Sequence, residues 1–239
     1  AVSYLSLAAN QTLDGQLNLR TDGELKTSGD GQYIGDMELA GGKFSATDDQ
    51  LLGGTLSITA DSELTVSQGH TLTLSQTGGL PLEANTLTIS GGGNFVSGGV
   101  TLNNANSKLL LNSITVDSVI TSEESLGIDV DADSTVTSLS VGHITPVSIA
   151  STKTLSGAIA VSAGSLNLTE TGTLASTIAM IGGTLDADDN VTITGTVTQA
   201  GNSTIDVASE KTITFDTGTI NTENYQLTIE GAGTVAFPA

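Results

Sequence analysis

Alternating aspartates form the first pattern in this sequence whose residue types and spacing could bind a metal ion. Asp129, Asp131 and Asp133 place hard oxygen ligands close together, as calcium-binding loops do. The EF-hand rule is not met, because Ser134 stands where the turn glycine is needed and Ser140 replaces the bidentate glutamate at the twelfth position. The competing interpretation is that these aspartates cap a solvated turn. Calcium at this segment is therefore a hypothesis beside a structural role.

A second acidic segment and the two histidines invite the same comparison. Asp186, Asp188 and Asp189 could be calcium ligands, although a solvated corner explains them better. Neither His70 nor His143 has an acidic residue within four positions in the sequence, so we expect each to be a surface side chain. We assign no catalytic residue, no cofactor and no metal other than the calcium hypothesis.

Two further motifs resemble catalytic or nucleotide-binding sequences and lack an essential part. Asp48-Asp49 followed by Gly69-His70 is similar to pectin-hydrolase motifs, but the basic partner that should follow downstream is absent. The three glycines at 91–93 lack the Lys-Ser/Thr continuation of a phosphate-binding loop, so they predict a tight corner. We expect no enzyme activity and keep a polysaccharide-processing enzyme as an alternative.

The composition narrows the class of partner. The 239 residues include 6 basic and 26 acidic side chains, which gives a formal net charge of −20. Because so few cations are present to displace counterions from phosphate, we expect no binding to nucleic acid or to anionic lipid. No apolar run reaches the roughly eighteen residues that a transmembrane helix needs, so no membrane insertion is expected. The absence of cysteine excludes disulfides and thiolate metal sites.

A short apolar unit that repeats along the chain must position all these residues. Leu56, Leu64 and Leu72 recur at a spacing of eight, and each is followed two positions later by another aliphatic residue. Residues at i and i+2 lie on one face of a strand, and the Thr and Ser between them tolerate a half-solvated pleated surface. Each unit therefore predicts a short strand and a turn. Similar units continue at 85–90, 108–112, 191–199, 203–209, 211–216 and 225–230.

Strands repeated without helical crossovers are typical of a β-sandwich or barrel, or of a parallel β-solenoid. Tight Asp-Gly reversals, which sandwich hairpins favour, occur only at 14–15, 22–23 and 30–31. We predict one right-handed parallel β-helix over 1–239, with about three short strands per coil. Residues 51–239 should form regular coils, whereas 1–50 should be less regular or hold a cap. About ten coils of roughly 20 to 24 residues would give a rod on the order of 50 Å long.

This fold predicts an inside, an outside and two ends. Thr65 and Thr192 should lie on the outer side of the pleat. The segments AVSYLSLAAN and YQLTIEGAGTVAFPA carry almost no charge to blunt an exposed edge, so another layer is expected at one or both ends, either more polypeptide or a second subunit. The side chains expected to point inward are Leu64, Val66, Leu72, Leu74, Ile193, Ile205 and Ile213.

Phrases such as GGTLSITADSELTVS at 53–67 and NTLTISGGGNF at 85–95 resemble the repeats of large bacterial surface β-solenoids, including autotransporter passenger domains and filamentous-haemagglutinin-like adhesins. GGTLDADDNVTITGTV and GNSTIDVASEKTITF extend the resemblance over most of 50–239. It implies an extracellular or cell-surface location and a role as a rigid, adhesive shaft or spacer. The implied partners are glycans or a host or neighbouring cell surface. A self-assembling filament or surface-layer subunit, with end-to-end association, is the alternative.

Overall fold

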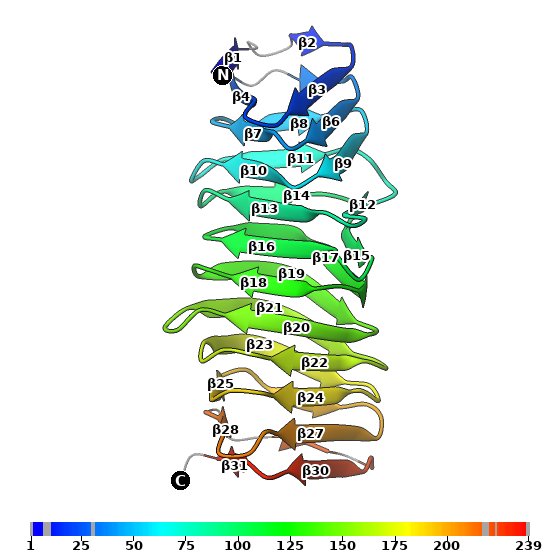
Figure 1. Cartoon of the computed structure of the whole chain (residues 1–239), viewed down its shortest axis with the longest axis vertical. Coiled ribbons are helices and arrows are strands. Elements are labelled where there is room, and N and C mark those ends of the chain that lie inside the picture. The colour runs from blue at the N-terminus through cyan, green and yellow to red at the C-terminus, as the bar shows by residue number, and fades with distance from the viewer. Residues whose placement is uncertain (1, 7–10, 30–31, 217–219, 223, 238–239) are drawn as a thin grey trace.

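The computed structural model describes residues 2–6, 11–29, 32–216, 220–222 and 224–237. In these ranges the protein is a parallel β-solenoid of about eleven turns without a helix, which confirms the predicted fold class. Figure 1 shows the coils stacked along one axis, with the two ends of the chain at opposite ends of the rod. At about 4.8 Å per coil the stack is about 50 Å long.

Sheet A is an uninterrupted ladder of twelve strands, because every coil contributes one strand to it and all its neighbours pair in parallel. Its strands in order are β1 (Val2–Ser6), β4 (Glu24–Ser28), β7 (Lys43–Ala46), β10 (Ser62–Val66), β13 (Thr86–Ser90), β16 (Lys108–Asn112), β18 (Gly127–Val130), β20 (Ile144–Ile149), β22 (Ser165–Leu168), β24 (Thr184–Ala187), β27 (Ser203–Val207) and β30 (Leu227–Gly231).

Sheet B forms the second face and begins after the turn that follows each sheet A strand. Its main strands are β2 (Thr12–Leu13), β5 (Gln32–Tyr33), β8 (Gln50–Leu52), β11 (Thr71–Leu74), β14 (Asn94–Val96), β17 (Thr115–Glu124), β19 (Ser134–Val141), β21 (Thr154–Val161), β23 (Thr173–Met180), β25 (Val191–Ile193), β28 (Thr212–Phe215) and β31 (Thr234–Ala236). We call the turn from sheet A into sheet B the A–B corner.

The third face changes along the rod. In the first coils it is a separate sheet C, made of β3 (Leu17–Arg20), β6 (Met37–Ala40) and β9 (Leu56–Ala60). In the middle coils the long strands β17, β19, β21 and β23 continue from the second face onto the third, with register shifts in β17 and β19. The remaining strands are β12 (Leu80–Pro81), β15 (Val100–Asn103), β26 (Val197–Gln199) and β29 (Ile220–Asn221), which join sheet B.

The core is a column of mainly aliphatic side chains stacked coil upon coil, with a few phenylalanines among them. Phe44, Leu64, Ile89, Leu111 and Val130 occupy the same register position in five successive sheet A strands, and all are fully buried. Complete burial of one such side chain contributes about 1.5–3 kcal/mol. All the predicted inward residues are buried, which confirms the inward register: Leu64, Val66, Leu72, Leu74, Ile193, Ile205 and Ile213.

The eight-residue spacing between successive leucines reflects the three-sided coil. Leu56, Leu64 and Leu72 lie in β9, β10 and β11, which belong to three different faces. A full coil therefore covers roughly three such units. Thr65 and Thr192 are half-buried on the outer side of the pleat, as predicted.

Candidate functional site

The A–B corner carries most of the residues that the sequence singled out. His70, the glycines 91–93, Asp133 and Asp189 all precede a sheet B strand, each in a different coil. His143 lies elsewhere, between β19 and β20, so the two histidines do not meet. The fold thus gathers these residues along one edge of the rod and distributes them over its length.

Aspartate and asparagine side chains at corners connect one coil to the next. Asp49 Oδ1 accepts a hydrogen bond from the N–H of Thr71 at 2.8 Å, and Asp133 Oδ1 accepts one from Thr154 at 2.9 Å. Asn190 Oδ1 does the same for the N–H of Thr212 at 2.9 Å. Each partner begins a sheet B strand one coil further on, so these carboxyl and amide oxygens cap the start of that strand.

The three alternating aspartates, Asp129, Asp131 and Asp133, have different surroundings in the structure. Asp129 lies on β18 and its Oδ2 is 2.5 Å from Lys108 Nζ on the neighbouring strand β16. Asp131 is exposed at the corner, and Asp133 caps Thr154. Within the described ranges no group of three or more His, Cys, Asp or Glu side chains is arranged to hold a metal ion. Nothing in this geometry tests the calcium hypothesis, but Asp129 and Asp133 each have a structural partner within the protein.

Asp186 belongs to a stack of carboxylates that the sequence analysis did not find. It lies opposite Asp206, and Asp206 lies opposite Glu230, on the outer side of β24, β27 and β30. Burial raises the pKa of Asp186 from its ordinary value of 3.8 to about 6, and the charges of Asp188 and Asp206 add to the rise. The sequence carries no signal for this stack, because the number of residues from one coil to the next varies along the chain. Asp189 differs from them, because a hydrogen bond from Lys211 lowers its pKa.

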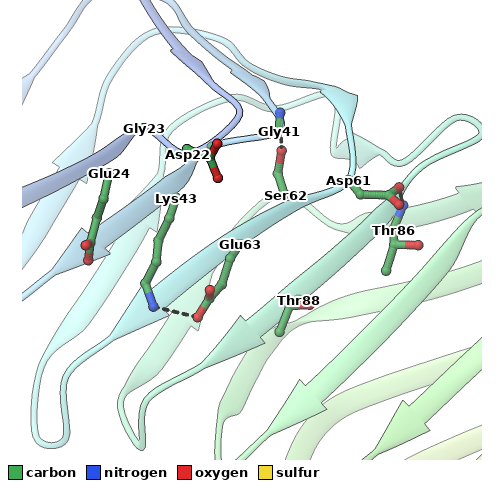
Figure 2. Close-up of a pocket in the computed structure, with 11 residues that line it drawn as sticks. Asp22, Gly23, Glu24, Gly41, Lys43, Asp61, Ser62, Glu63, Thr86 and Thr88 are labelled. Carbon is green, nitrogen blue, oxygen red and sulfur yellow. Dashed lines mark hydrogen bonds and ion pairs between the residues drawn. The ribbon is translucent and has the colours of Figure 1, made fainter. Parts of the chain in front are cut away.

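One groove on the surface lies where sheet C turns into sheet A, and we call it the Lys43 groove (Figure 2). Its volume is about 450 Å³, and it spans four coils. Glu24, Lys43 and Glu63 occupy one register row across β4, β7 and β10. The residues that line it are Asp22, Gly23, Glu24, Gly41, Gly42, Lys43, Asp61, Ser62, Glu63, Thr86 and Thr88.

The charges of the Lys43 groove already have partners within the protein. Lys43 Nζ is 2.7 Å from Glu63 Oε1, as the dashed line in Figure 2 marks. Burial acts to raise the pKa of Glu63, but hydrogen bonds from Lys43, Thr65 and Ser90 outweigh it and hold the pKa below its ordinary value. Asp61 Oδ1 accepts the N–H of Thr86 at 2.7 Å. Ion pairs and hydrogen bonds in this groove therefore connect neighbouring coils. Because these pairs are partly exposed to solvent, each contributes little to the stability of the folded protein.

A second groove lies at the A–B corner, and we call it the His70 groove. Its volume is about 330 Å³, and a smaller hollow of about 140 Å³ shares Gly92 and Thr115 with it. The imidazole of His70 lies between two carboxylates, with Nδ1 3.7 Å from Asp49 Oδ1 and Nε2 3.9 Å from Asp48 Oδ1. The groove is lined by Gly69, His70, Thr71, Gly92, Gly93, Asn94 and Thr115.

Asn94 gives the His70 groove an unusual feature that the sequence did not signal. Its Oδ1 atom is buried and has no hydrogen-bond partner among the described residues. Buried polar atoms are normally paired, and Ser165 Oγ, Asn167 Oδ1 and Gln199 Oε1 are the other exceptions among the described residues. The triad of Asp48, Asp49 and His70 is the part of this site that the sequence did indicate, through the pectin-hydrolase-like motif.

Comparison of the chain with protein-family models, with curated proteins and with solved structures finds no match. In the part of the chain that the structure describes, no helix is long and apolar enough to cross a membrane. The interpretation of function therefore depends on the architecture and on the two grooves.

Proposed function

We propose that this protein is a non-enzymatic, extracellular structural rod of a bacterial surface, which holds weak adhesive contacts at a fixed distance from the cell. The observation that carries the proposal is the unbroken parallel ladder of sheet A from β1 to β30. Each internal strand in this ladder is paired on both sides, so bending the rod requires many backbone hydrogen bonds to be strained together.

The outer surface supports an adhesive role better than a catalytic one. The Lys43 and His70 grooves are open, lined mainly by polar residues and glycine, and built from residues of successive coils. Repeated hydroxyl, amide and carboxylate groups on a stiff rod suit many weak contacts made at once, because multivalency raises the overall affinity without a deep pocket. The resemblance of the repeats to bacterial surface adhesins agrees with this role.

Small-angle scattering and an activity assay test the proposal together. The protein is expected to scatter as an elongated particle at every concentration in the dilute range, and a compact profile would contradict the shaft role. Incubation with acidic polysaccharides is expected to release no reducing ends. Release that depends on Asp48 or His70 would replace the shaft with the polysaccharide-processing alternative.

A second role, as a self-assembling filament, is favoured by the last described coil. This end coil, formed by β29, β30 and β31, exposes 55% of Ile229, 48% of Phe237 and 42% of Tyr225. At the other end of the rod, β1 and β2 offer the opposite edges of the sheet A and sheet B ladders. A second copy stacked head to tail would continue both ladders and bury the apolar end coil, and such a contact repeats without closing.

Sedimentation of the 239-residue chain over a wide range of concentration tests the filament. Self-association is expected, and Ile229→Lys should weaken it. Ile144→Lys is the matched control, because Ile144 is 57% exposed on the side of the rod. A chain that stays monomeric at every concentration, or an equal effect of the two substitutions, would refute end-to-end stacking while leaving the shaft role intact.

A further inference from the structure

One outer row of sheet A passes from an amide to carboxylates. Asn167, Asp186, Asp206 and Glu230 lie directly opposite one another on β22, β24, β27 and β30, which are consecutive strands of the ladder (Figure 1). Neighbours in the row are one strand spacing apart, about 4.8 Å. Pro146 of β20 precedes Asn167 in the same row. Asp186 therefore has an uncharged amide on one side and a carboxylate on the other.

The side-chain amide of Asn167 has an acceptor without a donor. Its Oδ1 atom is buried and has no hydrogen-bond partner among the described residues. A buried acceptor left unpaired destabilises the fold, and such atoms are rare. Because the atom has almost no accessible surface, its donor must come from the protein itself. Of its two neighbours in the row, Pro146 has no side-chain donor, whereas Asp186 becomes one when its carboxyl group is protonated.

The surroundings of Asp186 favour that proton. Burial raises the pKa of its carboxyl group from the ordinary value of 3.8 to about 6, and the charges of Asp188 and Asp206 add to the rise. Glu230 places one more negative charge next along the row. The orphan acceptor and the row of like charges are separate observations, and a proton on Asp186 answers both of them.

The other charged groups on the elements packed against β24 do not offset this effect. None of β22, β24, β27 and β30 carries a basic residue. Glu170 follows β22 and Glu210 follows β27, and both are acidic. Lys211 is engaged elsewhere, since its Nζ lies 2.8 Å from Asp189 Oδ1. No cation on these elements is therefore left to stabilise an ionised Asp186.

We propose that Asn167 and Asp186 form a pH-sensitive contact between β22 and β24, in which the protonated carboxyl group of Asp186 donates a hydrogen bond to Asn167 Oδ1. When the proton leaves, the carboxylate repels Asp206 and the Asn167 acceptor loses its donor. Because the folded state holds this proton more tightly than the unfolded chain does, the contact is formed in acid and is lost as the pH rises through about 6. The inference applies to the rod whether it serves as a shaft or as a filament.

NMR titration of the ¹³C-labelled 239-residue chain from pH 8 to pH 5 tests the contact. The side-chain carboxyl carbon of Asp186 is expected to titrate with a midpoint near pH 6. The side-chain carbonyl carbon of Asn167, which reports hydrogen bonding at Oδ1, should shift with the same midpoint. An Asp186 carboxylate that is still ionised at pH 5, or an Asn167 signal that does not follow it, would overturn the proposal.

The variant Asn167→Ala removes the acceptor without changing any charge. It is expected to lower the proton affinity of Asp186 about three- to tenfold, because a hydrogen bond made only by the protonated form is lost. Asn94→Ala is the matched control and should leave the affinity unchanged, since Asn94 Oδ1 is also buried without a partner but lies on β14 of sheet B. An affinity that Asn167→Ala raises would mean that the amide donates to the carboxylate, and an unchanged affinity would mean that no bond exists. Either result refutes the contact.

Hydrogen exchange measures the consequence for the rod. After correction for the intrinsic exchange rate, the backbone amides of β22 and β24 should open about tenfold less often at pH 5 than at pH 7.5. In Asp186→Asn the protection should be high at both pH values, because the new amide donates at either pH. β10 and β13 in the early coils control for changes in the whole chain. The same pH dependence in those strands, or none in β22 and β24, would contradict a local contact.

Discussion

Replacing Asp186 with asparagine is expected to stabilise the folded protein at neutral pH. Its carboxylate lies opposite that of Asp206, which lies opposite Glu230. Like charges at directly opposite positions of neighbouring strands destabilise a sheet. Asparagine has nearly the same shape and no charge, and Asn167 already occupies the same row opposite Asp186. The substitution therefore removes the repulsion between the carboxylates of Asp186 and Asp206 and keeps the stacking of side chains along the row.

The size of the effect follows from the pKa. Burial, with the charges of Asp188 and Asp206, raises the pKa of Asp186 from 3.8 to about 6. At about 1.4 kcal/mol per pH unit, this would destabilise the ionised folded state by about 3 kcal/mol. Since Asp186 is only half-buried, solvent screens part of the repulsion. We therefore expect Asp186→Asn to add about 1 to 2 kcal/mol to the free energy of unfolding at pH 7.5.

The sign of the pH dependence follows from the same values. The folded state holds the proton of Asp186 more tightly than the unfolded chain does. Between pH 6 and pH 4 the wild-type protein therefore gains stability as protons are added, and most of the destabilisation is gone by about pH 4. The advantage of the asparagine variant should be nearly complete at pH 6 and should shrink to about a third of its full value by pH 4.5.

Urea denaturation of both proteins at pH 7.5, 6.0, 5.0 and 4.5, followed by circular dichroism, measures the difference. Asp131→Asn is the control for net charge, because Asp131 is an exposed corner residue and the substitution removes the same single charge. Asp206→Asn should give part of the gain, and the double variant less than the sum of the two. A gain that persists unchanged at pH 4.5, or that Asp131→Asn reproduces, would refute the reasoning.

Three further outcomes are expected. Ile193→Asp buries an unpaired charge and should lower the free energy of unfolding by about 4 kcal/mol. Thr192→Asp, on the outer side of the pleat, should change it by less than about 1 kcal/mol. If urea denaturation shows the larger loss for Thr192→Asp, the assigned register is wrong. Gly93→Ala should lower the melting temperature because its Cβ meets backbone, whereas Gly78→Ala, with nothing within 4 Å, should not. Calcium or a chelator should leave the melting temperature unchanged, since a lysine and a backbone N–H already engage two of the three alternating aspartates.

The sequence alone determines that the chain forms short strands separated by turns and on which side of the pleat each residue lies, and the turn chemistry favours a solenoid over a sandwich. Aliphatic residues two apart, as in Leu64 and Val66, can share one face only in a strand, and the absence of a 3.6-residue period excludes an amphipathic helix. The even spacing of Leu56, Leu64 and Leu72 then requires strands separated by turns. These are local properties, so they can be predicted from the sequence without knowing which strands pair.

Only the tertiary structure decides which residues meet across coils, because the corners differ in length. The N–H of Thr55 bonds Asp36 across 19 residues, whereas that of Thr86 bonds Asp61 across 25. Because this offset varies, the sequence could not predict that Lys108 pairs with Asp129, nor that Asp186 and Asp206 stand opposite each other. Register between coils is set by packing in the core, and the grooves and carboxylate stack on the surface follow from that register.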